Sequence, residues 1–396
     1  MSSPDHIKRQ KQIFLLLVTV IGLSIIAVFL QLDFLKQLEY STWDSRVRVV
    51  ADPAKADPKI KIIVIDQESL EALAKDGITW PWPRSLYAPV IKYLEHAGAK
   101  GLAIDLLFTE TSAWGVEEDI QFGEALNPNF PVINTVVLHK AKHSLPEDKF
   151  QIWTERSGFS YQRSIDFLGD LKVGTHQSLT LPTNEILEHS FWLGNVSENS
   201  DQDGIFRHYQ IGGYVEELPF LNLPFALFAS SNQSDFRKLD SFIGDNNQLT
   251  VNFHGPALTY DTYRFEPVLK SANALELGEE PRVKPENFEN AWVFLGAQAP
   301  GLLDLRPTPL AAVYPGVEYH ATVLDNYLHS DFIKKVSLPV TLLLCLVFLL
   351  LLNSSTLFFR SLRYELLAVL IALSAFIFLS GTLAAYNFGL LAAVPF

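Results

Sequence analysis

The sequence predicts an α/β domain with a mixed, mainly parallel sheet, together with transmembrane helices. Two observations support this fold class. Short apolar runs alternate with segments of helical periodicity in the middle of the chain, and longer uncharged apolar runs lie near both ends. The 396 residues carry a formal net charge of −13, most of it in the middle. We therefore expect a water-exposed globule between apolar segments.

Three apolar runs are long enough to cross a bilayer as helices. The first, Ile13–Leu30, has 18 residues without a charge, or about 27 Å of helix. Basic residues precede it and no cleavage pattern of a signal peptide follows it, so we expect an uncleaved anchor. The other two runs are Val336–Leu352 and Leu366–Tyr386.

Basic residues favour the cytoplasmic side of a membrane. We expect the cytoplasmic side for the basic residues before the first run, and for Arg360 and Arg363 between the second and third runs. The globule lies between the first and second runs, so it is expected outside the cytoplasm. The apolar tail Phe388–Phe396 is too short to span, so we expect either a fragment of a longer protein or a tail in the membrane interface. The expected segments are a cytoplasmic N-terminus (1–12), a transmembrane helix (13–30), the extracytoplasmic domain (31–335), a transmembrane helix (336–352), a cytoplasmic loop (353–365), a transmembrane helix (366–386) and the start of a further, incomplete transmembrane segment (387–396).

The first part of the globule predicts strands and helices in alternation. Apolar, β-branched runs indicate strands, and apolar residues three and four positions apart indicate one face of a helix. The expected order is helix Glu39–Val50, strand Ile60–Ile65, helix Pro83–Ala97 with Val90, Ile91 and Leu94 on one face, strand Gly101–Leu107, helix Glu117–Leu126 and strand Phe130–Leu138. This spacing favours parallel βαβ units with right-handed crossovers.

The pattern is weaker after the third strand. Residues 139–193 predict loops and minor strands. Beyond them we expect strands over Ile205–Ile211, Leu249–Phe253 and Trp292–Ala297, and helices over Leu218–Ser230 and Val317–Tyr327.

Composition excludes several kinds of chemistry. The single cysteine, Cys345, lies in an apolar run, so the globule has no thiol for a disulfide or a thiolate metal site. An acidic globule without a basic stripe is not expected to bind nucleic acid. The sequence contains no Gly-x-Ser-x-Gly and no Gly-x-x-x-x-Gly-Lys, and His254 and His320 are lone histidines that no His-x-x-x-His pair or cysteine supports as zinc ligands. We therefore expect no catalytic residues, no cofactor and no metal site.

Two aspartates and one aromatic segment are the candidate ligand-binding residues. Asp66 and Asp105 follow or end predicted strands, where ligands bind to parallel sheets, so both carboxylates could face one cleft. The alternative is that they cap helices and loops. Trp80, Trp82 and Arg84 belong to a stiff Trp-Pro-Trp-Pro-Arg segment that could stack on a sugar-like or planar ligand and bind an anion. Alternatively, the tryptophans seal the edge of the sheet and Arg84 pairs with Asp66 or Asp105.

Several motifs together resemble one known family. They are Ile65-Asp66-Gln67-Glu68-Ser69-Leu70, Trp80-Pro81-Trp82-Pro83-Arg84-Ser85-Leu86-Tyr87, Asp203-Gly204-Ile205-Phe206-Arg207, Asn252-Phe253-His254-Gly255-Pro256 and Pro315-Gly316-Val317-Glu318-Tyr319-His320-Ala321. The set resembles the second type of CHASE domain, the cyclase/histidine-kinase-associated sensory extracellular domain. The resemblance covers about Trp43–Leu328, nearly the whole globule.

The resemblance implies a sensor in the inner membrane of a bacterium, with a cytoplasmic N-terminus and a periplasmic or extracellular sensor domain. It also implies a homodimer, and a cytoplasmic adenylate cyclase, histidine kinase or protein kinase as the output, for which this sequence carries no domain. Asp203, Arg207, Asn252 and His320 then become structural or signalling residues, with Arg207 as a buried ion-pair partner. The expected partners are the lipid bilayer and a small ligand or periplasmic partner. The aromatic and acidic candidate residues fit a sugar, an amine or a peptide, and the sequence does not choose among them.

Two other functions stay open at this stage. One is a membrane-anchored binding or scaffold protein without an output. The other is an extracytoplasmic hydrolase that uses Asp66 and Asp105 as a general acid and base.

Overall fold

The computed structural model describes residues 33–141, 147–156, 158–231, 239–244, 247–302 and 304–334, with Phe236 and scattered positions within 13–28 and 339–374. The chain divides into one compact unit of residues 51–332 and a second of residues 1–50 and 333–396. In the second unit, helix α2 (Asp33–Val50) ends at Val50, which is the predicted end, three residues before Pro53.

The membrane segments are not tested by the described residues. No helix among them combines the length and the apolar character needed to cross a bilayer. The predicted helices 13–30, 336–352 and 366–386 lie mostly outside the described residues, and the tail 387–396 lies wholly outside them. These segments therefore stay predictions.

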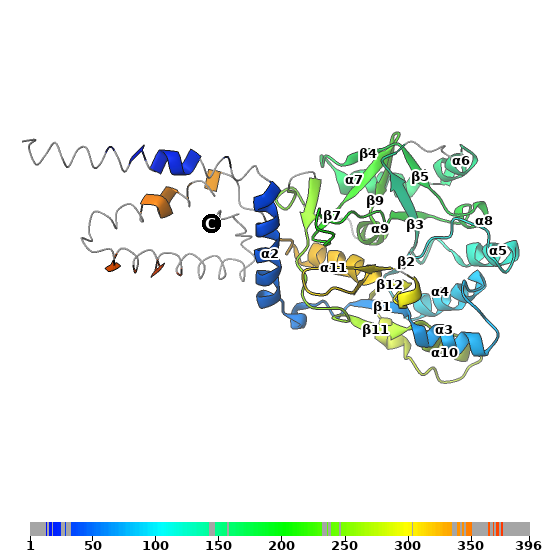
Figure 1. Cartoon of the computed structure of the whole chain (residues 1–396). Helices are drawn as coiled ribbons and strands as arrows, with labels where there is room; N and C mark the ends of the chain where they lie inside the picture. The colour runs from blue at the N-terminus through cyan, green and yellow to red at the C-terminus, as the bar shows by residue number, and fades with distance from the viewer. Residues whose placement is uncertain are drawn as a thin grey trace, which may run out of the picture. The chain divides into compact units, whose positions relative to one another are not determined.

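A seven-stranded sheet forms the centre of the unit of residues 51–332 (Figure 1). Its order is β11-β1-β12-β2-β3-β5, and β6 also pairs with β3. Only β3 and β5 pair antiparallel, so the predicted mixed, mainly parallel sheet is confirmed. The strands are β1 (Ile60–Ile65), β2 (Gly101–Asp105), β3 (Val132–His139), β5 (Ser178–Thr180), β6 (Trp192–Asn195), β11 (Asp261–Arg264) and β12 (Trp292–Ala297).

Strand β12 lies between β1 and β2, although it is the last strand of this sheet in the sequence. It pairs with β1 through Ile63 and Leu295, and with β2 through Leu295 and Ile104. Every residue of β1 and β12 is buried, as expected of central parallel strands that are covered on both faces. The crossover from β1 to β2 therefore skips one strand.

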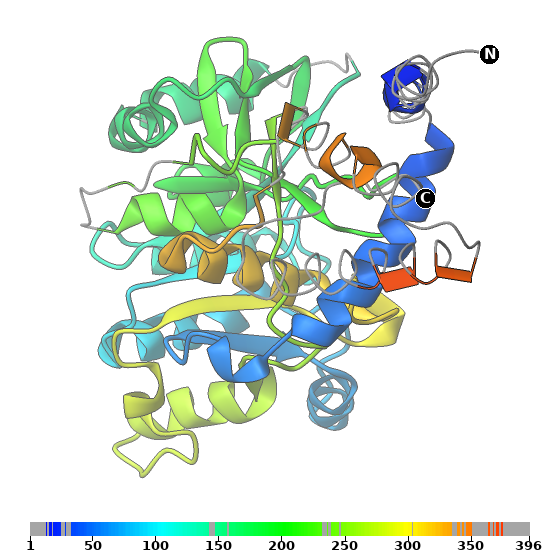
Figure 2. The same cartoon turned by 90° about the vertical axis from the view of Figure 1, so that its left-hand side faces the viewer.

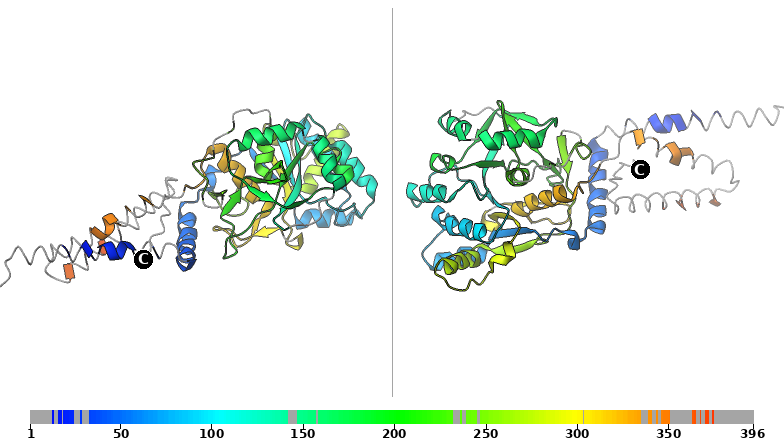
Figure 3. Two further views of the ribbon diagram at one scale, coloured as in Figure 1. Left: turned by 90° about the horizontal axis from the view of Figure 1, so that it is seen from above. Right: turned by 180° about the vertical axis from the view of Figure 1, so that it is seen from behind.

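Helices cover both faces of the sheet (Figures 2 and 3). One face packs against α3 (Gln67–Lys75), α4 (Tyr87–His96) and α10 (Phe265–Glu276). The predicted face of α4 is confirmed, because Val90, Ile91 and Leu94 are fully buried. The other face packs against α9 (Leu223–Ser230) and α11 (Gly316–His329).

Helix α11 runs antiparallel to the strands. Near its start, Val317 packs so closely on Gly296 of β12 that a Cβ at this glycine would lie 2.7 Å from the Cβ of Val317. Near its end, Asp325 accepts a hydrogen bond from the backbone N–H of Asp57, which precedes β1. One helix thus extends from the carboxyl-terminal edge of the sheet to its amino-terminal edge.

The region between β3 and β11 differs from the prediction. Residues 139–193 contain α6 (Glu147–Arg156), α7 (Gly158–Leu168) and α8 (Asn184–Leu187) besides β4 (Gly174–His176), β5 and β6. Helix α6 is polar apart from residues such as Trp153, whose ring stacks on Phe220 at 6.4 Å, so tertiary packing holds it. Expecting only loops and minor strands there was wrong.

Other short elements complete the unit. The predicted helix Leu218–Ser230 is partly wrong: residues Leu218–Leu221 form strand β9, which pairs with β8, and only α9 is helical. The remaining elements are β7 (His208–Gln210), β8 (Gly212–Val215), β10 (Gln248–Thr250), β13 (Leu305–Arg306), β14 (Tyr314–Pro315), α5 (Val116–Ala125), and the 3₁₀ helices η1 (Pro53–Lys55), η2 (Arg84–Leu86), η4 (Pro285–Phe288) and η5 (Pro300–Leu302).

Candidate functional site

A cluster of titratable side chains lies at the carboxyl-terminal edge of the sheet, where α11 begins. We call it the C-edge cluster. Asp105 ends β2 and His320 lies on the second turn of α11, while the others come from loops and short strands. Its members are Asp105, Glu198, Tyr209, Asp304, Arg306 and His320.

His320 is the fully buried centre of the C-edge cluster. Its Nδ1 lies 2.6 Å from the hydroxyl oxygen of Tyr209, and its Nε2 lies 3.6 Å from Oδ2 of Asp105. Arg306 Nη2 lies 3.6 Å from Oδ1 of Asp304. The carboxylate of Asp304 lies so close to Gly316 that a Cβ added there would be 2.3 Å from Oδ1, so a larger residue would displace this carboxylate.

Burial determines the charges of the C-edge cluster. Burial and then the neighbouring charge of Asp304 raise the pKa of Asp105 to about 8, against the opposing effect of Arg306. Burial also raises the pKa of Glu198 to about 8. Burial, then the charge of Arg306, keeps the pKa of His320 well below its usual value. Near neutral pH Asp105 and Glu198 are therefore protonated, and the imidazole of His320 is neutral, beside the Arg306 cation.

The two predicted aspartates have separate surroundings. Oδ1 of Asp66 accepts a hydrogen bond from the backbone N–H of Ser69 at 2.9 Å and caps helix α3, which was the alternative interpretation. Asp105 belongs to the C-edge cluster. Within the described residues no contact joins the two carboxylates, because β12 separates their strands.

The tryptophan segment packs partly into the core. Trp82 is buried and stacks on Phe265 with ring centroids 4.9 Å apart. Trp80 is 37% exposed and meets Trp82 edge-on at 5.3 Å. Trp114 donates from Nε1 to the carbonyl oxygen of Pro81 at 2.7 Å. Ligand binding by Trp80 and Trp82 stays a prediction.

Arg84 has a structural partner that the sequence did not indicate. Its guanidinium is buried, pairs with Asp119 on α5 and donates to the carbonyl oxygen of Glu110. The expected alternatives, Asp66 and Asp105, were wrong as partners. Anion binding by Arg84 stays a prediction, and this ion pair would have to open for it.

The residues singled out by the family resemblance make buried polar contacts. Arg207 is 2% exposed and lies 3.0 Å from a carboxylate oxygen of Asp201 and 2.9 Å from one of Asp203. Asn252 and Asn326 join β10 to α11 through two backbone–side chain hydrogen bonds of 2.8 and 2.9 Å. Their roles in signalling stay predictions.

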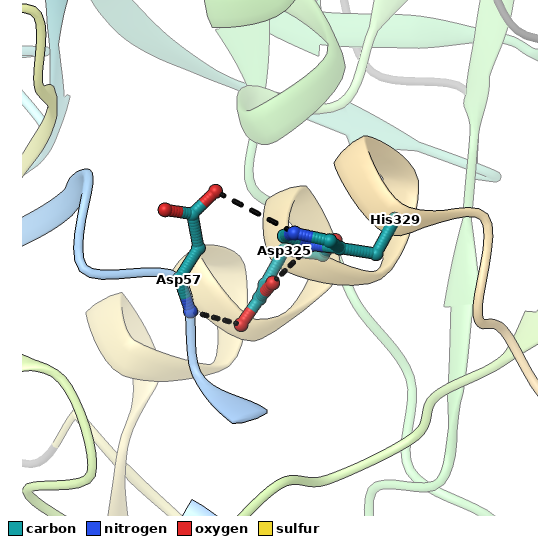
Figure 4. Close-up of side chains that lie close together, drawn as sticks. All are labelled: Asp57, Asp325 and His329. Carbon is teal, nitrogen blue, oxygen red and sulfur yellow. Dashed lines mark hydrogen bonds and ion pairs between the residues drawn. The ribbon is translucent and has the colours of Figure 1, made fainter. Parts of the chain in front are cut away.

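A second cluster lies at the amino-terminal edge of the sheet, where the unit of residues 51–332 begins and ends. We call it the N-edge cluster. Asp325, fully buried on α11, is its centre. Figure 4 shows three of its members, Asp57, Asp325 and His329. The complete set is Asp57, His254, Tyr260, Asp325, His329 and Asp331.

Three hydrogen-bond partners and one ion-pair partner surround the carboxylate of Asp325. Oδ2 accepts from the backbone N–H of Asp57 at 3.1 Å and from the hydroxyl of Tyr260 at 2.9 Å, and lies 3.1 Å from Nδ1 of His254. Oδ1 lies 2.8 Å from Nδ1 of His329. His254 also contacts Asp331 through Nε2 at 2.9 Å.

Hydrogen bonding determines the charges of the N-edge cluster. Burial lowers the pKa of His254, but the hydrogen bonds to Asp325 and Asp331 outweigh it and raise this pKa to about 9. Burial raises the pKa of Asp325, but the hydrogen bond and charge of His254 outweigh it, so this pKa lies below its usual value. An imidazolium therefore lies between two carboxylates at neutral pH.

Sequence reasoning found part of these clusters. It singled out Asp105 and His320 separately, and it missed Glu198, Asp304 and Arg306. The i, i+4 spacing of Asp325 and His329 gave no clear signal for the N-edge cluster, because the predicted helix Val317–Tyr327 ends two residues before His329. His254 belongs to a motif of the family, but neither it nor Asp57 indicated a partner, because the two come from distant segments.

One comparison with known proteins agrees with the motifs found in the sequence. The family model of the CHASE2 domain matches residues 16–354, most of the chain. No curated protein and no solved structure matches. The resemblance carried by segments such as Trp80–Tyr87 is thereby confirmed, and the chain belongs to the CHASE2 family of sensory extracellular domains.

Proposed function

We propose that this chain is the membrane-anchored, extracytoplasmic sensor module of a bacterial signal-transduction receptor. A stimulus at the globule changes its packing, and transmembrane helices on both sides of it pass this change to a cytoplasmic output domain of the cyclase or kinase type outside these 396 residues. The membership in a sensory family and the apolar runs before and after the globule support this role.

Helix α11 is the observation that carries the proposal. Its 14 residues span about 21 Å and connect the C-edge cluster to the N-edge cluster. His320 near its start and Asp325 near its end lie on the same helix, so a shift at one cluster displaces the other. The N-edge cluster contains Asp57, seven residues after the end of α2, and Asp331, which precedes the apolar run Val336–Leu352.

The stimulus must bind the two packings of the globule with different affinity, since only differential affinity shifts an equilibrium. The carboxyl-terminal edge of the sheet is where parallel α/β proteins bind ligands, and Asp105 and Trp80 lie near it. A sugar, an amine or a peptide fits an acidic and aromatic edge. We further propose that the chain lies in the inner membrane and functions as a homodimer, as family resemblance implies.

The alternatives have less support. A hydrolase that uses Asp66 and Asp105 requires both carboxylates in one cleft, whereas Asp66 caps α3 and Asp105 contacts His320. A binding or scaffold protein without an output gives no reason for one helix to join two buried titratable clusters.

A reporter fusion tests the proposal. The full chain is joined to a cytoplasmic cyclase, and cyclic nucleotide production is measured in cells. Arg306→Gln should change the output at unchanged expression, because it alters the charge at the start of α11. The control Arg282→Gln changes an exposed arginine and should leave the output unchanged. Equal output from all three proteins would refute transmission through α11.

A second measurement tests the location of the globule. Cys345→Ala removes the native thiol, and Lys75→Cys places a new one on the exposed surface of α3. In intact cells an impermeant maleimide should label the second variant but not a control that carries Cys345→Ala alone. Labelling only after lysis would show that the globule lies in the cytoplasm.

A further inference from the structure

Three potential metal ligands of the N-edge cluster lie close together. One ligand atom each of Asp57, Asp325 and His329 can be chosen so that all three lie within 4.8 Å of one another (Figure 4). Asp325 and His329 are four residues apart and therefore adjacent on α11, while Asp57 comes from the loop before β1. The topology brings them together across 268 residues of sequence.

Each carboxylate has one oxygen held in place and the other directed to His329. Oδ1 of Asp57 accepts from the backbone N–H of Lys59 at 2.8 Å, and Oδ2 lies 3.9 Å from Nε2 of His329. Oδ2 of Asp325 is held by Tyr260 and by the N–H of Asp57, and Oδ1 faces the imidazole. Hydrogen bonds to the outer oxygen of a ligating carboxylate are the usual second layer of a metal site.

The side chains combine a rigid base with an accessible ligand. Asp325 is fully buried, the side chain of Asp57 is 17% exposed, and that of His329 is 49% exposed. Ligand atoms around a tetrahedral zinc ion lie roughly 3.3 Å apart, so the set must contract. The imidazole of His329 can supply this movement because half of it faces solvent.

The ligand set indicates the class of cation. Imidazole nitrogen with two carboxylates suits Zn²⁺ and neighbouring transition metals, whereas Ca²⁺ needs six to eight oxygen ligands. The metal would replace the proton of Nδ1 that His329 now shares with Oδ1 of Asp325. Two carboxylates would neutralise the charge of the ion, and His254 already balances Asp331.

We propose that Asp57, Asp325 and His329 bind a divalent transition-metal ion, with Zn²⁺ as its representative, at the point where the unit of residues 51–332 begins and ends. The ion links the segment that follows α2 to the last turn of α11. An effect of the metal on signalling rests on the sensory role proposed above, whereas metal binding does not.

Direct titration tests the site. The full chain, without an affinity tag and in detergent, is stripped with a chelator and titrated with Zn²⁺ by calorimetry. Co²⁺ replaces Zn²⁺ in a parallel experiment, because its visible absorption reports nitrogen and oxygen ligation. We expect one ion per chain, and a rise of the melting temperature with Zn²⁺.

Variants identify the ligands. His329→Ala and Asp57→Asn should each weaken Zn²⁺ binding at least about tenfold and abolish the Co²⁺ spectrum. His96→Ala removes an exposed histidine at the end of α4 and should leave both unchanged. Circular dichroism of the metal-free variants checks that each folds. The proposal would be overturned if both ligand variants bound Zn²⁺ with the affinity of the unaltered chain. It would also be overturned if the unaltered chain bound no Zn²⁺ in the titration.

The reporter fusion separates this site from the sensory role. If Zn²⁺ binds and changes the output of the unaltered chain but not of His329→Ala, both proposals stand. Binding without any change of output leaves the site in place and counts only against its regulatory effect. An output that responds to Arg306→Gln while Zn²⁺ fails to bind refutes the metal site alone.

Discussion

The C-edge and N-edge clusters both combine buried carboxyls with histidine on helix α11, but they hold different charges. In the C-edge cluster burial raises the pKa of Asp105 and of Glu198 to about 8, and it keeps His320 neutral. In the N-edge cluster the pKa of His254 rises to about 9 and that of Asp325 falls. The difference lies in hydrogen bonding. Asp325 has three hydrogen-bond partners and the nearby imidazolium of His254, whereas Oδ2 of Asp105 has no hydrogen-bond partner among the described residues.

This comparison shows that residue type does not decide charge in a folded protein. Donors that converge on a buried carboxylate stabilise the ionised form, and burial without enough donors favours the protonated form. The N-edge cluster is therefore a set of ion pairs and hydrogen bonds that joins the first and last segments of the unit of residues 51–332. The C-edge cluster is the part whose charge responds to protons near neutral pH.

The largest expected effect concerns Asp325. Asp325→Asn leaves the imidazolium of His254 with Asp331 alone and should lower the free energy of unfolding by about 3–5 kcal/mol. Urea denaturation of the full chain, followed by tryptophan fluorescence, measures it. Asp331→Asn is the control, because that side chain is 18% exposed and accepts fewer hydrogen bonds, so about 1–2 kcal/mol is expected. Equal losses would contradict a central role for Asp325.

A smaller effect is expected at Arg306. Arg306→Gln leaves Asp304 and Asp105 without their nearby cation and should cost about 2–3 kcal/mol at pH 8.5. The loss should shrink at pH 6, where protonated carboxyls need no cationic partner. Denaturation at both values checks this, with Arg282→Gln as an exposed control. A loss that is independent of pH would show that the carboxyls stay ionised.

The pH dependence of stability separates the clusters. The pKa of Asp105 rises from 3.8 to about 8 on folding, so the native state binds a proton that the unfolded state releases, and this contribution to stability falls as pH rises across that interval. Between those two pKa values, Asp105→Asn should reduce this slope by about 1.4 kcal/mol per pH unit. His254, raised from 6.5 to about 9, loses its contribution only as pH rises from about 6.5 through 9.

Acid should act on the N-edge cluster instead. The contribution of Asp325, whose pKa lies below 3.8, is present above that value and is lost as pH falls through its folded pKa. Melting temperatures from pH 3 to pH 9 for the unaltered chain, Asp105→Asn and His254→Gln test these windows. A slope between pH 4 and pH 6 that Asp105→Asn leaves unchanged would contradict the assignment to Asp105.

The smallest effect is expected at Asp66. Asp66→Ala removes the cap of α3 and should cost about 1 kcal/mol, without a change in the pH dependence that Asp105 causes. Asp66→Ser keeps a capping oxygen and should restore most of the stability. If Asp66→Ala altered the pH dependence in the same way as Asp105→Asn, the two carboxylates would share one site after all.

The sequence predicted the central layers of the fold well. Strands Ile60–Ile65 and Trp292–Ala297 have the predicted bounds, because central parallel strands are continuous apolar runs. Helices α6 and α7 were missed, since their few apolar residues gain their meaning only from the surface on which they pack. Residues Leu218–Ser230 were predicted as one helix, whereas the structure has strand β9 followed by helix α9. The boundary was missed because the strand and the buried helix are both continuously apolar.

The sequence by itself determined the mainly parallel α/β class, the apolar runs near both ends and the motifs of a sensory family, since all three are local patterns. Only the tertiary structure decided that β12 inserts between β1 and β2, that Arg84 pairs with Asp119, and that Asp57 meets Asp325 and His329. Those contacts join segments tens to hundreds of residues apart. Their partners depend on strand order and helix packing, which no local pattern encodes.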